Sequence, residues 1–384
     1  MKLAFQLALR NLLGSGLRTG LNAGVLSFSF VLIIFFNGML DGWNEQARRD
    51  GIAWEFGQGQ LLHEAYDPQD PFSIQEGHGP VPRAQGTLVP ILMRQASIYP
   101  EGRMLSVILK GIDPAQKTLK LPTRKLAVSR AEVPAIIGQR MAESAHLKVG
   151  DQVLLRWRDR HGTFDAGSAT IVDVFDTDVS AVDNGQIWID INQLWEMTGL
   201  TGQATLAVFD SEPDNPQVAG WTFKSKETLL QNITQIIEMK KSSGYILFIL
   251  LLGIALLAIF DTQVLSIFRR QKEIGTYVAL GMTRQQVVGL FTVEGGMYSL
   301  FALAAGALYG IPLFIYFANH GIGIPPASQN MGVALAERIF PVYGLMLVAG
   351  TMLVIVLAST LVSYLPARKI ATMNPVNALK GKLQ

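Results

Sequence analysis

The sequence predicts an α-helical membrane protein with four transmembrane helices and a large α+β domain inserted between the first and second helices. Of its 384 residues, 49% are hydrophobic and 16% are charged, whereas soluble domains typically contain about 25% charged residues. Four apolar segments are each close to or above the roughly 20 residues that a helix needs to cross a bilayer. About 200 residues between the first two segments alternate short polar and apolar runs, as a folded domain with its own core does.

The composition excludes several classes of function. The net charge is +2, and the basic residues cluster at membrane edges, so we expect no nucleic-acid partner. The chain contains no cysteine, which excludes disulfides, thiolate catalysis and cysteine-ligated metal. The sequence has no P-loop, no serine–histidine–aspartate pattern and no metal-ligand spacing. We therefore expect a non-catalytic chain that binds no metal and no cofactor itself.

The N-terminal residues 1–18 predict an amphipathic helix that lies on the membrane surface. Lys2, Gln6 and Arg10 share one stripe of this helix, and apolar residues cover the other side. Residues 19–41 are too long an apolar run for a signal peptide, and no small-residue cleavage site follows them. We interpret this run as an uncleaved first transmembrane helix.

The inserted domain is expected to span residues 42–225. Its alternation of apolar and polar residues predicts strands at 107–112, 152–157, 169–175, 186–189 and 205–209, and helices at 137–145 and 192–198. The proline-rich pieces 67–71 and 77–82 break regular structure. They form either a loop or a boundary between two subdomains.

Residues 226–268 predict one continuous helix that serves as a stalk and then crosses the membrane. Apolar residues recur at helical spacing from Leu229 onwards, and no helix breaker precedes the apolar run 245–268. Asp261 lies inside this run, where a charge is costly and usually faces a protein interior. It either pairs with another helix, for example across a dimer, or is partly solvated by headgroups.

The segment 269–284 is too polar to cross a membrane and predicts one short helix on its surface. Ile274, Tyr277 and Val278 fall on one apolar face of a helix through residues 272–280. After it, Gly281 can adopt the left-handed conformation that ends a helix. Thr283 and Gln286 then have the spacing of a capping box that starts the next helix.

The third and fourth transmembrane helices are expected at residues 285–317 and 340–365, joined by the short outer loop 318–339. Pro312 should kink the third helix or end its regular part. A stripe of small residues at i, i+4 and i+8 in the third helix is suited to close helix packing. It consists of Ala302, Gly306 and Gly310. Glu294, early in this helix, is a second intramembrane polar residue. A structural role in packing near the membrane interface explains it at least as well as a role in transport.

The orientation follows from the short basic segments. Residues 1–18, 269–284 and the tail 366–384 each carry an excess of Lys and Arg, whereas the loop 318–339 does not. With four spans, the three basic segments lie on one side of the membrane, which the positive-inside rule makes the cytoplasm. We therefore expect both termini in the cytoplasm and the inserted domain to be extracytoplasmic.

Three segments carry a specific family pattern. Residues 269–284 contain a basic pair, a charged residue before Glu-Ile-Gly, then Ala-Leu-Gly and a polar cap. Segment 136–176 contains Val-Gly-Asp before a strand, and the tail contains Pro-Ala-Arg-Lys followed by Asn-Pro-Val-Asn-Ala-Leu. The chain resembles the MacB/LolC/LolE/FtsX-type ABC transporter permease family, whose members carry these segments as a coupling helix, part of a periplasmic domain and a C-terminal signature.

This resemblance implies a permease of the bacterial inner membrane that works as a dimer, alike or different, with two ATPases. Because only residues 1–18 precede the first span, the P-loop ATPase that uses ATP and magnesium is expected as a separate subunit. The residues expected to couple to it are Lys272, Glu273, Ile274, Gly275, Tyr277, Val278, Ala279, Leu280 and Gly281.

The resemblance also implies mechanotransmission, in which coupling helices follow the ATPases and stalks carry the motion to external domains. Lipoprotein release from the inner membrane is the first hypothesis for the client. MacB-like export of peptides or drugs, and an FtsX-like or receptor-type protein that transports nothing, stay open. A hydrophobic groove at the base of the external domain would favour a lipid-bearing client, and a polar, closed domain would favour signalling or protein docking.

Overall fold

The structure is a computed structural model that describes residues 17–129, 131–214, 216–323 and 338–372. The chain divides into two compact units. The first contains Met1–Trp43, Ile237–Ile322 and Ile339–Gln384, and the second contains Asn44–Ile236 with Gly323–Arg338. The surface helix expected at residues 1–18 lies outside the described residues except for its last two, and so does most of the C-terminal tail.

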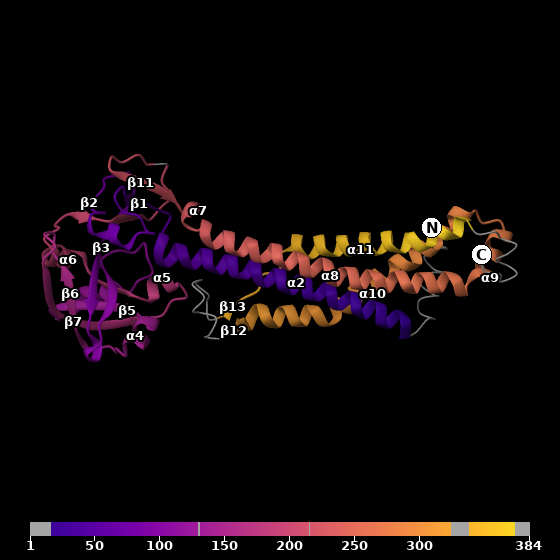
Figure 1. Ribbon diagram of the computed structural model, residues 1–384, viewed down its shortest axis with the longest axis horizontal. Helices are drawn as coiled ribbons and strands as arrows, with labels where there is room; N and C mark the ends of the chain where they lie inside the picture. Colours follow the sequence, from indigo (N-terminus) through magenta and orange to yellow (C-terminus); the bar gives the residue numbers. More distant parts are fainter. Residues whose placement is uncertain (1–16, 130, 215, 324–337, 373–384) are drawn as a thin grey trace. The chain divides into compact units, whose positions relative to one another are not determined.

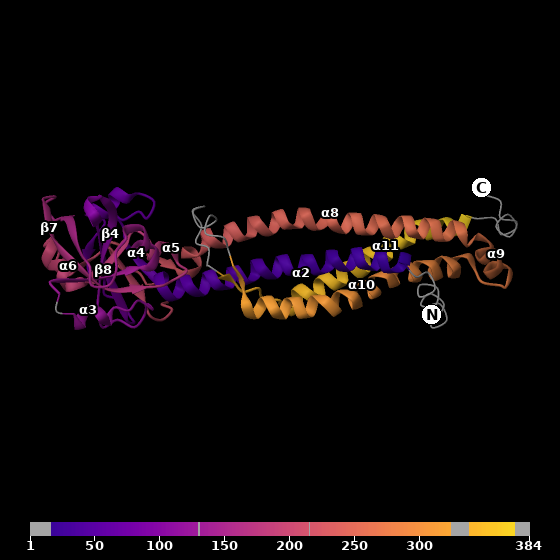
Figure 2. The same ribbon diagram turned by 90° about the horizontal axis from the view of Figure 1, so that it is seen from below.

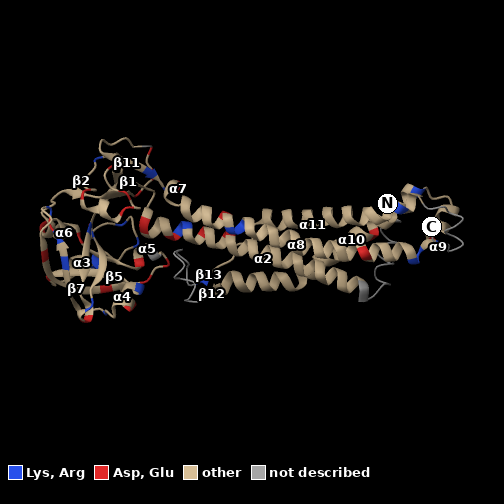
Figure 3. Cartoon of the chain, in the orientation of Figure 1, with Lys and Arg blue, Asp and Glu red and all other residues tan. Residues whose placement is uncertain are grey.

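The long helices are α2 (Leu17–Gly51), α8 (Gln231–Arg269), α10 (Arg284–His320) and α11 (Leu345–Ala367). Within the first unit they lie side by side in both views (Figures 1 and 2). Each is long and apolar enough to cross a membrane, with mean hydropathy between 1.9 and 2.6 over its most apolar window. Charged residues are sparse along the middle of these helices (Figure 3). The four helices predicted from composition are therefore present.

The helix bundle has a core to which all four helices contribute. Its buried residues are Leu26, Phe30, Val31, Ile34, Leu252, Ala255, Ile259, Met297, Tyr298, Ala302 and Ile355. Pro312 does not end α10, which continues to His320. A proline inside a helix removes one backbone hydrogen bond and crowds the preceding turn, and α10 is nevertheless continuous through this exposed residue.

The second unit is built on a mixed sheet. Nine strands are ordered β11-β1-β10-β3-β4-β8-β5-β7-β6. Their bounds are β1 (Gly59–His63), β3 (Leu88–Ile98), β4 (Leu105–Ile112), β5 (Val133–Gly138), β6 (Gln152–Arg158), β7 (Phe164–Phe175), β8 (Gln186–Asp190), β10 (Leu206–Phe209) and β11 (Trp221–Ser225). The end of β3 also pairs with β6, so the six strands from β3 to β6 close into a ring.

Two buried clusters hold this unit together. The first contains alternate residues of all six ring strands, such as Val107 and Leu109, together with residues of α4 (Gln139–Ala145) and α6 (Ile191–Thr198). The second includes Ile91, Met93 and Trp188, which have the opposite parity along the same strands. Because successive side chains of a strand point to opposite faces, both faces of the sheet are covered.

Short elements complete the chain. They are η1 (Ile52–Phe56), η2 (Pro71–Gln75), η3 (Pro100–Gly102), η5 (Arg368–Thr372), α3 (Arg124–Val128), α5 (Ser180–Asp183), α7 (Lys226–Leu229), α9 (Gln271–Ala279), β2 (Gly79–Pro80), β9 (Gln203–Ala204), β12 (Ile322–Gly323) and β13 (Arg338–Ile339).

Three local expectations need correction. The helix expected at 137–145 begins at Gln139, because Ile137 and Gly138 finish strand β5. The single helix expected at 226–268 is interrupted at Leu230, where α7 ends and after which α8 starts. The first helix extends ten residues beyond the expected span 19–41, to Gly51. Sequence patterns also missed strands β1, β3, β5 and β11.

Candidate coupling site

The segment between α8 and α10 folds as a short helix with defined ends. Arg270 leaves the helical conformation, with φ −104° and ψ 20°, so α8 stops and α9 starts in a new direction. At its other end, the N–H of Leu280 donates to the carbonyl of Thr276 at 2.9 Å. Gly281 follows with φ +98°, a conformation that favours glycine.

The start of α10 has the predicted capping box. The N–H of Gln286 donates to Oγ1 of Thr283 at 3.3 Å, and the N–H of Thr283 donates to Oε1 of Gln286 at 2.8 Å. These two bonds satisfy N–H groups that the first turn of a helix leaves without a partner. The cap therefore fixes the point at which α10 begins.

One face of α9 packs on the end of the bundle where α8 meets α10, as its apolar spacing predicted. Ile274 is 2% exposed, and Gly275 is also buried. Tyr277 and Val278 are partly buried against the same cluster. This cluster, which we name the coupling core, contains Ile267, Ile274, Val287, Val288, Phe291, Ala367 and Ile370. It joins α8, α9, α10, α11 and η5.

The opposite face of α9 is open in the single chain. Its exposed residues are Lys272, Glu273, Thr276, Ala279, Leu280 and Gly281. Leu280 is 79% exposed. Single exposed leucines are common on protein surfaces, so its exposure alone does not identify a binding site. The nine expected coupling residues thus divide into an inner set, Ile274, Gly275, Tyr277 and Val278, and an outer set that a partner can reach.

A buried ion pair lies at the N-terminal end of α9. Both Oε atoms of Glu294 accept from Nη1 of Arg270 at 2.9 Å. Nε of Arg270 donates to Oε2 of Glu273 at 2.7 Å. The guanidinium also lies 4.8 Å from the ring centroid of Phe291. The side chain of Glu294 is 6% exposed and that of Glu273 is 54% exposed.

Sequence reasoning assigned Arg270 only to a basic pair and missed this contact. The two partners are separated by 24 positions, and no local spacing rule connects residues in different helices at that distance. The available signal was a carboxylate early in an apolar span, which needs a cation nearby. Arg269 and Arg270 were both candidates for this cation, and the structure shows that Arg270 pairs with Glu294.

The other residues singled out from the sequence lie apart from α9. Asp261 is exposed on α8 and makes no hydrogen bond or ion pair with the residues that the structure describes. Ala302 is fully buried. A side chain at Gly306 would come within 2.9 Å of Phe30, and one at Gly310 within 2.9 Å of Val31. The small-residue stripe therefore packs on α2 of the same chain.

Buried polar contacts in the bundle were also missed. Nδ2 of Asn22 donates to Oγ1 of Thr262 at 2.7 Å, which joins α2 to α8. Gln263 is 1% exposed. An added methyl group on Gly295 would lie 2.2 Å from Oγ of Ser363. Serine, threonine and glutamine at helix contacts are typical of membrane bundles, but their spacing in the sequence did not identify their partners.

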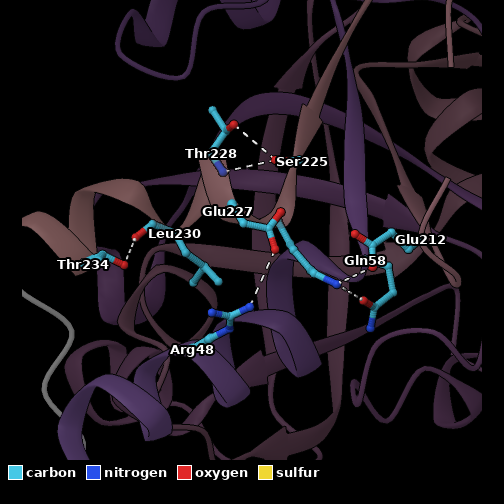
Figure 4. Close-up of polar contacts among 9 residues, drawn as sticks. Arg48, Gln58, Glu212, Ser225, Glu227, Thr228, Leu230 and Thr234 are labelled. Atoms are coloured by element: carbon cyan, nitrogen blue, oxygen red, sulfur yellow. Dashed lines mark hydrogen bonds and ion pairs between the residues drawn. The ribbon is translucent and has the colours of Figure 1, made fainter. Parts of the chain in front are cut away.

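Polar contacts also fix the entry of the chain into the second unit (Figure 4). Oγ of Ser225 accepts from the N–H of Thr228 and caps α7. Arg48, near the end of α2, lies 3.6 Å from Glu227. Lys226 donates to Glu212 at 2.7 Å and to Gln58 at 3.2 Å. Within this unit an ion pair thus joins the end of α2 to α7, and both of its side chains are more than half exposed.

Two hollows of the second unit are lined by a mixture of polar and apolar residues. One of about 300 Å³ is lined by residues such as Asp113, Gln116, Lys117 and Asp210. Another of about 730 Å³ is lined by residues such as Glu143, His146 and Lys148. Neither is the hydrophobic groove that would favour a lipid-bearing client. Among the described residues, no group of three or more His, Asp or Glu could hold a metal ion.

Comparison with known proteins gives matches in both units. Residues 245–375 match the family described as FtsX-like permease C-terminal. The chain is 23% identical over 255 residues to the lipoprotein-releasing system transmembrane protein LolC of Neisseria meningitidis serogroup B, covering 58% of this chain and 60% of that protein. It is 27% identical over 163 residues to the macrolide export ATP-binding/permease protein MacB of Wolinella succinogenes, covering 40% and 22%.

Two further similarities are more limited. An uncharacterized ABC transporter permease of Methanocaldococcus jannaschii is 30% identical over 124 residues, covering 32% of this chain and 29% of that protein. The chain thus spans less than two thirds of the length of each of these curated relatives. The extracellular domain of the noncanonic ABC-type transporter YknZ from Gram-positive bacteria aligns with 41% of this chain and 84% of its own, at 12% identity and a TM-score of 0.25, which is too low to support an argument.

Proposed function

This chain belongs to the MacB/LolC/FtsX-type family of ABC transporter permeases, and we propose that it is a non-catalytic membrane subunit that transmits force. In this proposal a separate cytoplasmic ATPase hydrolyses ATP with magnesium, and the chain carries the resulting motion to a client outside the bacterial inner membrane. The observation that carries the proposal is α9, a helix with one face seated in the coupling core and the other face exposed.

The exposed face of α9 supports docking of a protein. It combines an apolar anchor, Leu280, with the opposite charges of Lys272 and Glu273 and the small residue Ala279. Interfaces commonly combine an apolar centre with a polar rim. The inner face meets residues of α8, α10, α11 and η5, so a push on α9 reaches several spans at once.

We propose a lipoprotein as the client. The alignment with the lipoprotein-releasing protein LolC covers a larger share of both chains than the alignments with MacB do. The two mixed hollows of the second unit do not distinguish an acylated client from another protein. The exposed apolar side chains of α8, such as Leu250, Ile254 and Leu257, supply a surface of matching chemistry within the membrane.

The client is tested by purifying the chain with its ATPase in a mild detergent, after hydrolysis has been blocked by a non-hydrolysable ATP analogue, and recording native mass spectra. We expect an additional mass that corresponds to an acylated protein. A bound peptide or drug in its place would support MacB-like export. An ATPase complex that never carries a client, even from cells that overproduce lipoproteins, would support signalling.

A further inference from the structure

Arg270 occupies a position where three elements meet. It is the first residue after α8 and the residue before α9, and its guanidinium reaches Glu294 in the third turn of α10. Its side chain is 16% exposed. Nη1 makes both bonds to Glu294, and Nε makes the bond to Glu273.

The helix α9 is tied to α10 at both of its ends. At the C-terminal end the two helices are joined by the short link from Leu280 to Thr283. At the N-terminal end, where α9 could otherwise swing away with the end of α8, Arg270 holds Glu294. Between the two ends, Ile274 is buried against the coupling core.

We propose that Arg270 is the positioning residue that fixes α9 on α10, so that a displacement of α9 is delivered to α10 together with α8. This inference rests on the proposed function, and it assigns to α10 a share of the force that a stalk mechanism gives to α8 alone. Without Arg270, α9 stays connected to α8 through the backbone but loses its contact with the buried carboxylate of α10.

Arginine suits this position better than lysine. A guanidinium can satisfy both oxygens of a carboxylate and lie over an aromatic ring at the same time, whereas a lysine ammonium is a point charge on a flexible stem. Here Nη1 bonds to both oxygens of Glu294, Nε bonds to Glu273, and the guanidinium lies 4.8 Å from the ring centroid of Phe291. Arg270→Lys should therefore keep part of the attachment of α9 to α10, and Arg270→Gln should lose most of it.

Glu273 supplies a matched control. It bonds to the same guanidinium, but its side chain is 54% exposed, and exposed ion pairs contribute little. Glu294 is buried, and removal of one partner of a buried pair leaves an uncompensated charge. Glu273 and Glu294 therefore contact the same arginine, but only the loss of Glu294 is expected to release α9 from α10.

The test is hydrogen–deuterium exchange of the full chain in lipid nanodiscs without any ATPase. We expect the amides of α9 to exchange about tenfold faster in Arg270→Gln and in Glu294→Gln, because the local opening of α9 becomes easier. Glu273→Gln should change exchange by less than about twofold. The charge swap Arg270→Glu with Glu294→Arg should restore much of the protection. Unchanged exchange of α9 in Glu294→Gln, which preserves side-chain volume, would overturn the proposal.

A second measurement separates this inference from the proposed function. With the ATPase present, Arg270→Gln should still bind it through the exposed face of α9 but should lose most of the change in ATP hydrolysis that an added purified triacylated lipoprotein causes in wild type. Full retention of that change would contradict the positioning role. If no ATPase binds wild-type chain, the proposed function fails, while the exchange experiment still decides whether Arg270 holds α9.

Discussion

Among single residues, Lys110 shows how burial and charge compete in the second unit. It lies in β4, is 6% exposed, and its Nζ is 4.8 Å from the ring centroid of Trp188. Burial lowers the pKa of Lys110 to about 8, and the charge of Glu55 opposes that shift. Burial raises the pKa of Glu55, and Lys110 opposes that shift in turn. Each group therefore makes the other easier to keep charged inside the unit.

The pKa of Lys110 predicts a pH dependence with a definite sign. Between about pH 8 and 10.5 the unfolded chain binds the proton of this lysine while the folded chain has released it, so stability rises with pH in that window. Relative to Lys110→Met, the free energy of unfolding of wild type should rise by up to about 3 kcal/mol across it, at about 1.4 kcal/mol per pKa unit. Tryptophan fluorescence during denaturant unfolding of the full chain measures this. Parallel pH profiles for the two proteins would contradict it.

Helix contacts in the first unit depend on the absence of side chains at particular glycines. A side chain at Gly295 would meet Ser363 at 2.2 Å, and one at Gly306 would meet Phe30 at 2.9 Å. Gly289, in the same helix α10, has no atom within 4 Å of the position of an added carbon. The three glycines therefore share a helix and differ in their surroundings.

Alanine at these glycines should separate packing from helix propensity. Gly295→Ala and Gly306→Ala should destabilise the bundle by about 1–3 kcal/mol, because overpacking forces neighbouring helices apart. Gly289→Ala should be neutral or stabilise it by up to about 1 kcal/mol, because alanine is the better helix former. Thermal unfolding in detergent micelles provides the comparison. Equal losses at all three positions would mean that α10 does not pack as described.

Asp261 gives a prediction about the surface of α8. It shares the exposed side of this helix with apolar residues such as Leu257 and Leu265, and a carboxylate that faces lipid is costly. If it pairs across a dimer of permeases, Asp261→Leu should lower the dimer fraction in nanodiscs severalfold, whereas Asp261→Asn should retain most of it. Mass photometry measures the fraction. An unchanged fraction in Asp261→Leu would leave solvation by headgroups as the explanation.

At the scale of the whole molecule, the sequence predicted the four apolar helices and the inserted domain because composition and length determine them. It predicted α9 and the capping box of α10 because these depend on residues a few positions apart. It did not predict the contact between Arg270 and Glu294 or the packing of Gly306 on Phe30, because both join separate helices. The break at Leu230 escaped prediction because the apolar pattern continues through it.

The absence of cysteine from the chain allows a direct test of the predicted orientation. A single cysteine at Thr276 in α9 should react with a membrane-impermeant maleimide only after the inner membrane is opened. A cysteine at Gln69, an exposed position of the second unit, should react in intact spheroplasts. The reverse pattern would contradict the orientation that the basic segments indicate.

The central claim is that the exposed face of α9 binds a separate ATPase, and co-purification from native membranes tests it most directly. The variant Glu273→Arg with Ala279→Arg changes this face, and Glu196→Arg with Ala166→Arg makes the same substitutions at exposed positions of the second unit. We expect a P-loop ATPase to purify with wild type and with the second variant, and to be lost from the first. An ATPase that stays bound to the first variant, or that never accompanies wild type, would contradict the claim.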